Sequence, residues 1–380
     1  MQPGRPAICW SAWYYIKEEA IFFMAIPVSA NMNKKIRVMV VDDSMVARSL
    51  IIKGLSAHPR IEVVGFAINT LDAKAKIPQY NPDVITMDVE MPGQSGIDFL
   101  KQYLPTHPIP VILVSSLNLK VFDALAVGAV DFVRKPDDQQ SADSFIASLS
   151  QKVIIASNAR PRLTAAPSPA SAAAAVSSAI PKLGGGPGLN NVIIGLGAST
   201  GGTEATLAVM KRLPADIPPM VIVQHMPPGF TKMYAERLNR LCAMEVREAQ
   251  SGDELHRGLA LIAPADLQCR VVRIGTRYTV NCTPGEKVSG HRPSVDAMFQ
   301  SMADVVNCKM VGIIMTGMGQ DGAVGLLAMR KKGAYTIGQD KESSVVYGMP
   351  GVAQNIGAVM IQASCDNISN VLLRHLKTLG

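Results

Sequence analysis

The sequence predicts an α/β protein made of two doubly wound domains. Short apolar runs alternate with helical patterns in both halves of the chain, and a stretch rich in Ala, Pro, Ser and Gly lies between the halves. Hydrophobic residues make up 48% and charged residues 18% of the chain, as expected of a globular protein with large cores. We therefore expect an N-terminal extension at 1–32, a first domain at 33–156, a linker at 157–189 and a second domain at 190–380.

The first domain is predicted from five regularly spaced strand patterns. Helical patterns such as 45–57 and 119–127 lie between these strands. Strand followed by helix at this spacing predicts a five-stranded parallel sheet with helices on both faces. The expected strands are 36–41, 61–68, 84–87, 111–114 and 130–133.

The second domain repeats the α/β pattern after a flexible tether. Three prolines within the Ala-rich stretch argue against a long helix there, so we expect an extended linker. A mainly parallel α/β sheet is expected beyond it. Its expected strands are 192–196, 220–224, 259–262 and 311–315.

The N-terminal extension contains an apolar run at 20–28 that is too short to span a bilayer. The charges before this run are mostly acidic, unlike those of a secretory leader. We expect folded structure to begin near Lys34, and residues 1–32 to be disordered or to precede the true start at Met32.

The charge and the cysteine content indicate which partners and which cellular compartment to expect. The net charge is +7, but no basic stripe with interleaved aromatics is present, so nucleic-acid binding is not expected. Six cysteines without a C-x-x-C pair predict reduced thiols in a cytoplasmic protein. We expect a monomer without membrane insertion.

Polar residues follow several strands of the first domain. Asp42 and Asp43 follow the first strand, Asp88 the third, Ser115 the fourth and Lys135 the fifth. The carboxyl ends of parallel strands share one edge, so three carboxylates would converge there and bind Mg²⁺. The Ser115 hydroxyl and the Lys135 ammonium would complete a site for a phosphoryl group. Each residue alone could instead be a helix cap or a turn residue.

A glycine-rich loop, GLGASTGGTEA, follows the first strand of the second domain. The G-x-S-x-G pattern around Ser199 is typical of a nucleophile on a sharp strand-to-helix turn, where helix amides face a developing oxyanion. A nucleotide-binding loop and a plain tight turn are the alternatives. The G-x-G-x-x-G spacing and a Walker lysine are both missing.

A serine nucleophile needs a base and an acid that orients the base. His225 directly follows the expected strand 220–224, and Asp321 lies in the glycine-rich turn after 311–315. Three strand ends therefore supply Ser199, His225 and Asp321. His256 and His291 are rival bases, but neither directly follows a clear strand.

Residues 36–156 resemble a response-regulator receiver domain, with a flavodoxin-like fold, through the motifs VVDDS, MDVEMPGQSG, VSSL and DFVRKP. The resemblance implies that Asp88 accepts a phosphoryl group from a CheA-type histidine kinase. It implies a Mg²⁺ site made by Asp42, Asp43, Asp88 and the backbone of Glu90. Ser115 and Lys135 would bind the phosphoryl oxygens, and Phe132 would be the aromatic residue that responds. The stretch from Ser115 to Lys135 is about one helical turn short for this family.

Residues 191 to about 375 resemble the catalytic domain of the CheB family of chemotaxis protein-glutamate methylesterases. The motifs are IGLGASTGGTEA, VIVQHMPPGF, GHRPSVDAMF and MTGMGQDGAVGL. The resemblance implies that Ser199 attacks a receptor glutamyl methyl ester while His225 and Asp321 assist, and that receptor glutamines are deamidated. Backbone amides of Thr200 and Met318 are the oxyanion candidates. No cofactor is expected in this domain.

The receiver resemblance also implies regulation, in which the unphosphorylated receiver covers the esterase site. Arg292 and Asp296 match a family motif near the cleft, although an ion pair or a helix cap would explain them equally well. Two other functions stay open. The second domain could be a phospho-regulated binding module, or an esterase for a different acyl substrate.

Overall fold

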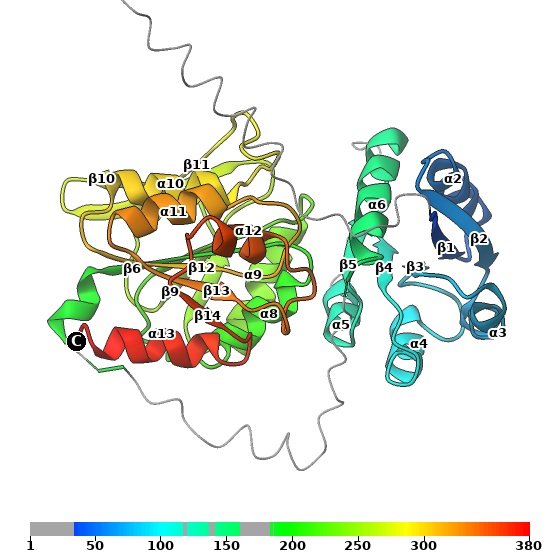
Figure 1. Ribbon diagram of the computed structural model, residues 1–380, viewed down its shortest axis with the longest axis horizontal. Helices are drawn as coiled ribbons and strands as arrows, with labels where there is room; N and C mark the ends of the chain where they lie inside the picture. Colours follow the sequence, from blue (N-terminus) through cyan, green and yellow to red (C-terminus); the bar gives the residue numbers. More distant parts are fainter. Residues whose placement is uncertain (1–33, 117–119, 137–140, 160–182, 185) are drawn as a thin grey trace, which may run out of the picture. The chain divides into compact units, whose positions relative to one another are not determined.

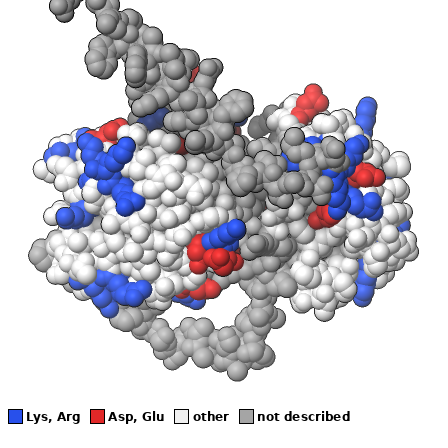
Figure 2. Space-filling view, in the orientation of Figure 1, with Lys and Arg blue, Asp and Glu red and all other residues white. Residues whose placement is uncertain are grey.

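The computed structural model describes residues 34–116, 120–136, 141–159, 183–184 and 186–380. The expected extension at 1–32 lies outside the described residues, as does most of the expected linker. No helix in the described part of the chain is long and apolar enough to cross a membrane. On the face shown in Figure 2, Lys and Arg side chains lie in small separate groups.

The first sheet has five parallel strands in the order β2-β1-β3-β4-β5. The predicted strands agree with the observed ones to within one residue at each end. The strands are β1 (Ile36–Val41), β2 (Ile61–Ala67), β3 (Val84–Asp88), β4 (Val111–Ser115) and β5 (Asp131–Arg134). The predicted doubly wound, flavodoxin-like fold of this half is confirmed, because the order reverses between β1 and β3.

Helices cover both faces of this sheet. One core cluster joins the strands to α2 and α6, and another joins them to α3, α4 and α5 (Figure 1). The bounds are α2 (Met45–Ser56), α3 (Thr70–Tyr80), α4 (Gly96–Tyr103), α5 (Lys120–Ala126) and α6 (Ala142–Ala156). The chain leaves β1 and β3 at the same edge, which places Asp42, Asp43 and Asp88 there.

The second sheet has seven parallel strands in the order β14-β13-β12-β6-β7-β9-β8. The four expected strands are observed and lie next to one another at its centre. They are β6 (Val192–Ala198), β7 (Met220–Gln224), β9 (Leu259–Ile262) and β12 (Lys309–Ile314). A short 3₁₀ helix, η1 (Pro187–Asn191), precedes β6 and begins within the region 157–189 predicted as linker.

Three further strands of this sheet were not predicted: β8 (Glu245–Glu248), β13 (Tyr335–Gln339) and β14 (Ile361–Ala363). The edge strands β8 and β14 are short and partly polar, and β13 reads YTIGQ, so all three lack the apolar run that marks most central parallel strands. An antiparallel hairpin of β10 (Gln268–Ile274) and β11 (Arg277–Thr283) was also not predicted. The predicted mainly parallel α/β class is nevertheless confirmed.

Helices flank the second sheet on both faces, with α10, α11 and α12 on one face and α8, α9 and α13 on the other (Figure 1). Their bounds are α8 (Gly202–Met210), α9 (Phe230–Leu241), α10 (Val295–Val305), α11 (Ala323–Lys331), α12 (Met349–Asn355) and α13 (Ile368–Lys377). Because β6, β7 and β12 are parallel, their carboxyl ends lie at the same edge of the sheet.

Candidate active site and acidic cluster

Ser199 follows β6 directly, and hydrogen bonds hold its backbone on both sides. Its N–H donates to the Thr316 carbonyl over 3.0 Å. Its carbonyl accepts from Gly202 N–H over 2.7 Å and from the Gln224 side-chain amide over 2.8 Å. Gly201 adopts φ +76° at the start of α8, a conformation that glycine reaches without strain. The loop is therefore a sharp strand-to-helix turn with a fixed serine.

The turn after β12 packs against this serine at a glycine. A Cβ atom placed on Gly317 would lie 2.8 Å from the Ser199 Cβ and 2.3 Å from the Met349 sulfur. Such contacts are too short for real side chains, so any larger residue would displace the serine or the methionine. Glycine at this position lets the β6 and β12 turns meet.

His225 and Asp321 are brought together from the ends of β7 and β12. The His225 Nε2 and the Asp321 Oδ2 atoms lie 2.9 Å apart. Because the carboxylate accepts a hydrogen bond, Nε2 carries the proton and Nδ1 holds the free lone pair. Among the described residues, the buried Nδ1 atom has no hydrogen-bond partner. Nδ1 is therefore the nitrogen available as a base.

Asp321 is 1% exposed and lies at the N-terminus of α10. It accepts hydrogen bonds from the Ser294 hydroxyl at 2.7 Å and from the N–H groups of Val295 and Asp296 at 2.8 and 2.9 Å. Burial alone would raise the pKa of Asp321, but the bonds from His225 and from α10 hold it below its ordinary value. The carboxylate therefore stays ionised beside the imidazole.

The two rival histidines differ in position. His291 stacks on the His225 ring with centroids 3.8 Å apart. Burial, together with the neighbouring His225, lowers the pKa of His291 to about 4. The exposed His256 instead pairs with the Arg257 carbonyl. Only His291 of this pair belongs to the site, as a neutral ring against His225.

Two residues that were not predicted, Ser294 of the motif GHRPSVDAMF and Gln268 of β10, connect to Asp321. Ser294 caps α10 and also bonds Asp321. The Gln268 side chain accepts from Ser294 N–H and donates to the carbonyls of Glu286 and His291. A serine directly before an apolar helical pattern is a recognisable cap, but only the fold could place it on Asp321.

Arg292 and Asp296 lie near this site without contacting each other. Arg292 donates to the Gly285 carbonyl and lies 3.8 Å from Asp266. Asp296 accepts from Ser289 and from Gly325 N–H, and burial raises its pKa. Both residues therefore have structural contacts, and the N–H of Asp296 also reaches Asp321.

The two oxyanion candidates lie on the turns that meet at Ser199. Thr200 follows the serine, and its hydroxyl donates to Asp131 over 2.6 Å. Met318 follows Gly317 in the β12 turn and is 41% exposed. Their roles as amide donors remain predictions.

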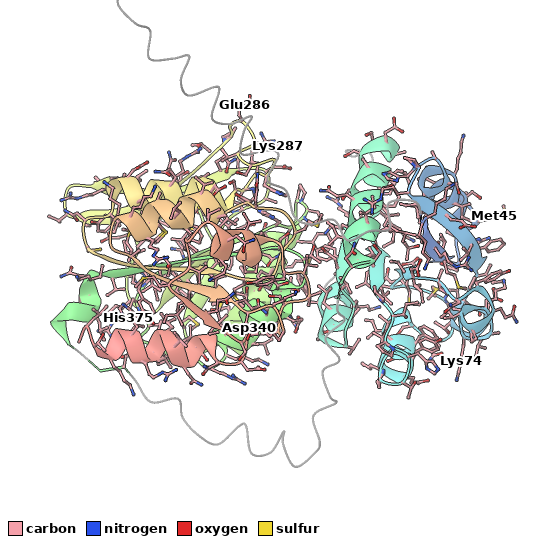
Figure 3. The ribbon with its side chains drawn as sticks, viewed as in Figure 1. Met45, Lys74, Glu286, Lys287, Asp340 and His375 are labelled. Carbon is pink, nitrogen blue, oxygen red and sulfur yellow. The ribbon has the colours of Figure 1, made fainter. Side chains whose placement is uncertain are left out.

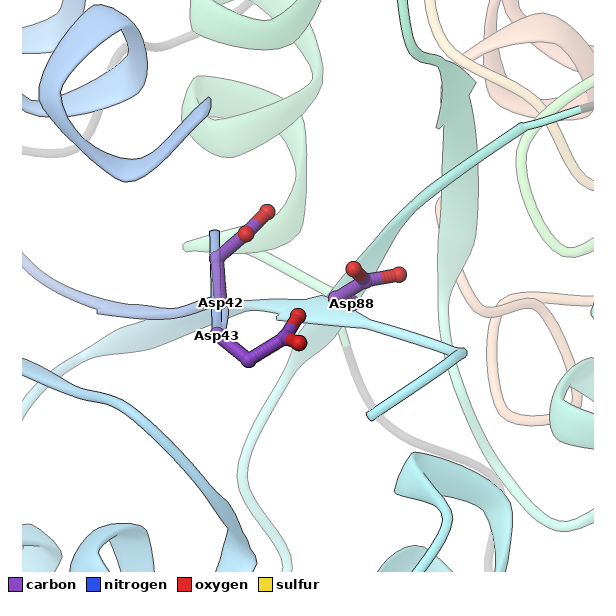
Figure 4. A group of neighbouring side chains, drawn as sticks. All are labelled: Asp42, Asp43 and Asp88. Atoms are coloured by element: carbon purple, nitrogen blue, oxygen red, sulfur yellow. The ribbon is translucent and has the colours of Figure 1, made fainter. Parts of the chain in front are cut away.

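The expected acidic residues meet at the edge of the first sheet. One oxygen each of Asp42, Asp43 and Asp88 lies within 4.8 Å of the others (Figure 4). The helix-cap interpretation of the two aspartates is wrong, because the cap of α2 is Ser44, whose N–H donates to Asp42. Glu90 N–H donates to Asp88 over 3.1 Å.

Lys135 and Ser115 complete this acidic cluster. The Lys135 ammonium lies 2.6 Å from Asp88 and 3.0 Å from Asp42. Burial raises the pKa of Asp88, and the ammonium offsets only part of that effect. The buried Ser115 hydroxyl has no hydrogen-bond partner in the described part of the chain. Clustered carboxylates of this kind suit a divalent cation with hard oxygen ligands.

Comparisons with known proteins agree with this architecture. Residues 38–146 match the model of the response regulator receiver domain, and residues 194–372 match that of CheB methylesterase. The "protein-glutamate methylesterase/protein-glutamine glutaminase 2" of Syntrophomonas wolfei is 47% identical over 91% of this chain and 99% of that protein. The "protein-glutamate methylesterase/protein-glutamine glutaminase" of Syntrophotalea carbinolica is 46% identical over 89% of this chain and 97% of that protein.

A solved structure, the CheB methylesterase catalytic domain of Thermotoga maritima, is 34% identical and covers 48% of this chain and 97% of that one, with a TM-score of 0.47. The two curated relatives match this chain from the receiver through the catalytic half. The chain belongs to the CheB family of protein-glutamate methylesterase/protein-glutamine glutaminases.

Proposed function

We propose that this chain is a phosphorylation-activated serine hydrolase that removes γ-methyl esters from chemoreceptor glutamates and deamidates particular receptor glutamines. The observation that carries the proposal is the bond between His225 and Asp321 beside the fixed turn of Ser199. The receiver would span 33–156, the linker 157–189 and the esterase 190–380. The protein would act in the cytoplasm, as a monomer.

The proposed reaction begins when the Ser199 hydroxyl attacks the ester carbonyl and His225 Nδ1 takes its proton. The ionised Asp321 stabilises the resulting imidazolium through Nε2. Amides at Thr200 and Met318 would donate to the oxyanion. His225 then protonates the leaving methanol, or ammonia from glutamine, and water attacks the acyl-enzyme. Glutamate is the product in both cases.

His291 would support this reaction without exchanging the proton. Its ring covers one face of His225 at 3.8 Å. A neutral neighbour excludes water from that face and adds no charge when His225 becomes an imidazolium. This stacking would hold the His225 ring in the orientation in which Nε2 bonds Asp321 and Nδ1 is free to act as the base.

The receiver would be phosphorylated on Asp88 by a CheA-type histidine kinase. Asp42, Asp43, Asp88 and the Glu90 carbonyl would hold Mg²⁺, which neutralises charge on the carboxylates and on the phosphoryl oxygens. The Ser115 hydroxyl, which is unpaired among the described residues, would donate to a phosphoryl oxygen. Lys135 would leave the Asp88 carboxylate and pair with the phosphoryl group.

We propose that contacts between the receiver and the catalytic half control access to Ser199, an arrangement called the gate below. Asp131 at the start of β5 accepts from the Thr200 hydroxyl, one residue from the nucleophile. The rings of Phe132 and Phe230 lie 4.5 Å apart. A receiver bound this close to Ser199 would block a large protein substrate. Phosphorylation would weaken this arrangement and shift the population toward an open site.

The deciding experiment is methanol release from membranes that contain methyl-labelled chemoreceptors. The native chain, Ser199→Ala and Asp88→Ala are compared with Mg²⁺, with and without acetyl phosphate. Release should be lost in Ser199→Ala, and acetyl phosphate should stimulate release only when Asp88 is present.

Failure would have recognisable forms. No release from any sample, although the receiver is phosphorylated, would contradict the methylesterase proposal for these receptors. Hydrolysis of small esters in that case would support another acyl substrate. Stable receptor binding without hydrolysis would support the binding-module alternative.

A further inference from the structure

Cys269 and Cys282 lie directly opposite each other on the antiparallel strands β10 and β11. Neighbouring residues of a strand point to opposite faces, so paired residues point to the same face. Cys269 is fully buried and Cys282 is 9% exposed. Both are free thiols in this structure. The proposed esterase mechanism uses neither of them.

The hydrogen bonds of Cys282 identify the type of pair. Its N–H donates to the Ser251 hydroxyl over 2.9 Å, and its carbonyl accepts from the same hydroxyl over 2.9 Å. Two residues along, Val280 N–H bonds the Asp253 carbonyl and the Val280 carbonyl accepts from Gly252 N–H. The backbone of Cys282 therefore faces away from β10, and the two cysteines form a non-hydrogen-bonded pair.

This pair type suits a cross-strand disulfide. Residues opposite each other at such a position have Cα atoms about 4.5 Å apart, with their side chains close together. Disulfides occur with Cα separations of about 4.4–6.8 Å, so little backbone movement is needed. We infer that Cys269 and Cys282 are a redox site, which peroxide converts into a reversible disulfide that locks the hairpin.

The two thiols differ in pKa, which favours Cys282 as the thiol that reacts first with peroxide. The adjacent Cys269 thiol lowers the pKa of Cys282, whereas the adjacent Cys282 thiol and burial raise the pKa of Cys269. The Cys282 thiolate attacks hydrogen peroxide and breaks the O–O bond, which gives a sulfenic acid and a hydroxide; the hydroxide takes the proton that the Cys282 thiol released and becomes one water. The Cys269 sulfur then attacks the Cys282 sulfur, and the hydroxyl leaves with the Cys269 proton as a second water. Two thiols lose two electrons and two protons.

The location gives the bond a structural consequence. The side chain of Gln268, next to Cys269, donates a hydrogen bond to the carbonyl of Glu286. Glu286 lies in the loop after β11 and is labelled in Figure 3. Gln268 also holds Ser294, a partner of Asp321. Closing the hairpin would restrict the unfolded chain and raise the melting temperature. The inference does not depend on the esterase activity.

The test uses the reduced full-length chain treated with hydrogen peroxide, then blocked with iodoacetamide and digested without reductant. We expect one linked pair of peptides, joined through Cys269 and Cys282 and two hydrogens lighter than the sum of its parts. Reductant should remove the link. Cys282→Ala should lose the link, whereas Cys308→Ala, changed outside the hairpin, should keep it.

Two results would overturn the inference. One is recovery of Cys269 and Cys282 as free thiols, or as sulfinic acids without a link, after peroxide treatment of the native chain. The other is a linked chain whose melting temperature equals that of the reduced chain, because the hairpin would then not be locked. The peptide map of the native chain does not depend on any variant folding.

Discussion

His225 donates to Asp321 through Nε2, and its buried Nδ1 atom has no hydrogen-bond partner among the described residues. Asp321→Asn should lower kcat on methylated receptors by about a thousand- to ten-thousandfold, because an amide can hold the opposite tautomer. Release of labelled methanol measures this. His256→Asn, an exposed control, should keep full activity. Equal rates for native chain and Asp321→Asn would remove Asp321 from the mechanism.

Gly317→Ala should damage the site through packing alone. The added methyl would lie 2.3 Å from the Met349 sulfur and 2.8 Å from the Ser199 Cβ. We expect a loss of about 1–3 kcal/mol in the free energy of unfolding. A serine displaced by about 1 Å should cost roughly a hundredfold in kcat. Urea unfolding and methanol release measure the two effects.

Gly357→Ala is the matched control for that substitution. Gly357 has φ +74° and no atom within 4 Å of an added Cβ. It should cost about 1 kcal/mol from backbone strain and leave kcat unchanged. If both variants lose activity alike, the close approach at Gly317 is not the cause.

Asp43→Asn should weaken Mg²⁺ binding to the acidic cluster. It removes one of three carboxylates whose oxygens lie within 4.8 Å. We expect the Kd to rise roughly ten- to a hundredfold, since even supporting groups of a metal site have effects of this size. Isothermal titration of the full chain with Mg²⁺ measures it. Asp98→Asn, which changes an exposed partner of Lys101, should bind like the native chain.

Asp131→Ala should raise the basal esterase activity of the unphosphorylated chain. It removes the 2.6 Å bond from Thr200 without touching the proposed triad. A hydrogen bond to a charged group contributes about 1.5–3 kcal/mol, so roughly a tenfold rise in activity is expected. Acetyl phosphate should then stimulate the esterase activity of Asp131→Ala less than that of the native chain. Asp143→Ala on the same domain is the control, and unchanged basal activity in Asp131→Ala would argue against this contact in the gate.

His291 should make the native fold less stable in acid. Its pKa is lowered to about 4 by burial and by His225, so the unfolded chain binds a proton between about pH 6.5 and 4 while the folded chain does not. The contribution of His291 to stability should therefore fall through this window, by up to about 3 kcal/mol, and level off below it. Urea unfolding at several pH values should show a smaller fall for His291→Asn. An equal fall in both proteins would exclude His291 as the source.

The sequence by itself determined which residues follow the central strands. Ser199, His225 and Asp321 could be read as strand-end residues because central parallel strands are continuous apolar runs. The same argument placed Asp42, Asp43 and Asp88 at one edge, because parallel strands bring their carboxyl ends together. These positions depend on local pattern and on the general geometry of parallel sheets.

Only the tertiary structure decided how those residues meet. The choice of Nε2 for Asp321, the stacking of His291 on His225 and the cap of Ser294 on Asp321 depend on contacts between segments far apart in the chain. The pairing of Cys269 with Cys282 depends on a hairpin register, which weakly apolar strands do not reveal. Local patterns specify elements, whereas packing between elements specifies the orientation of each side chain.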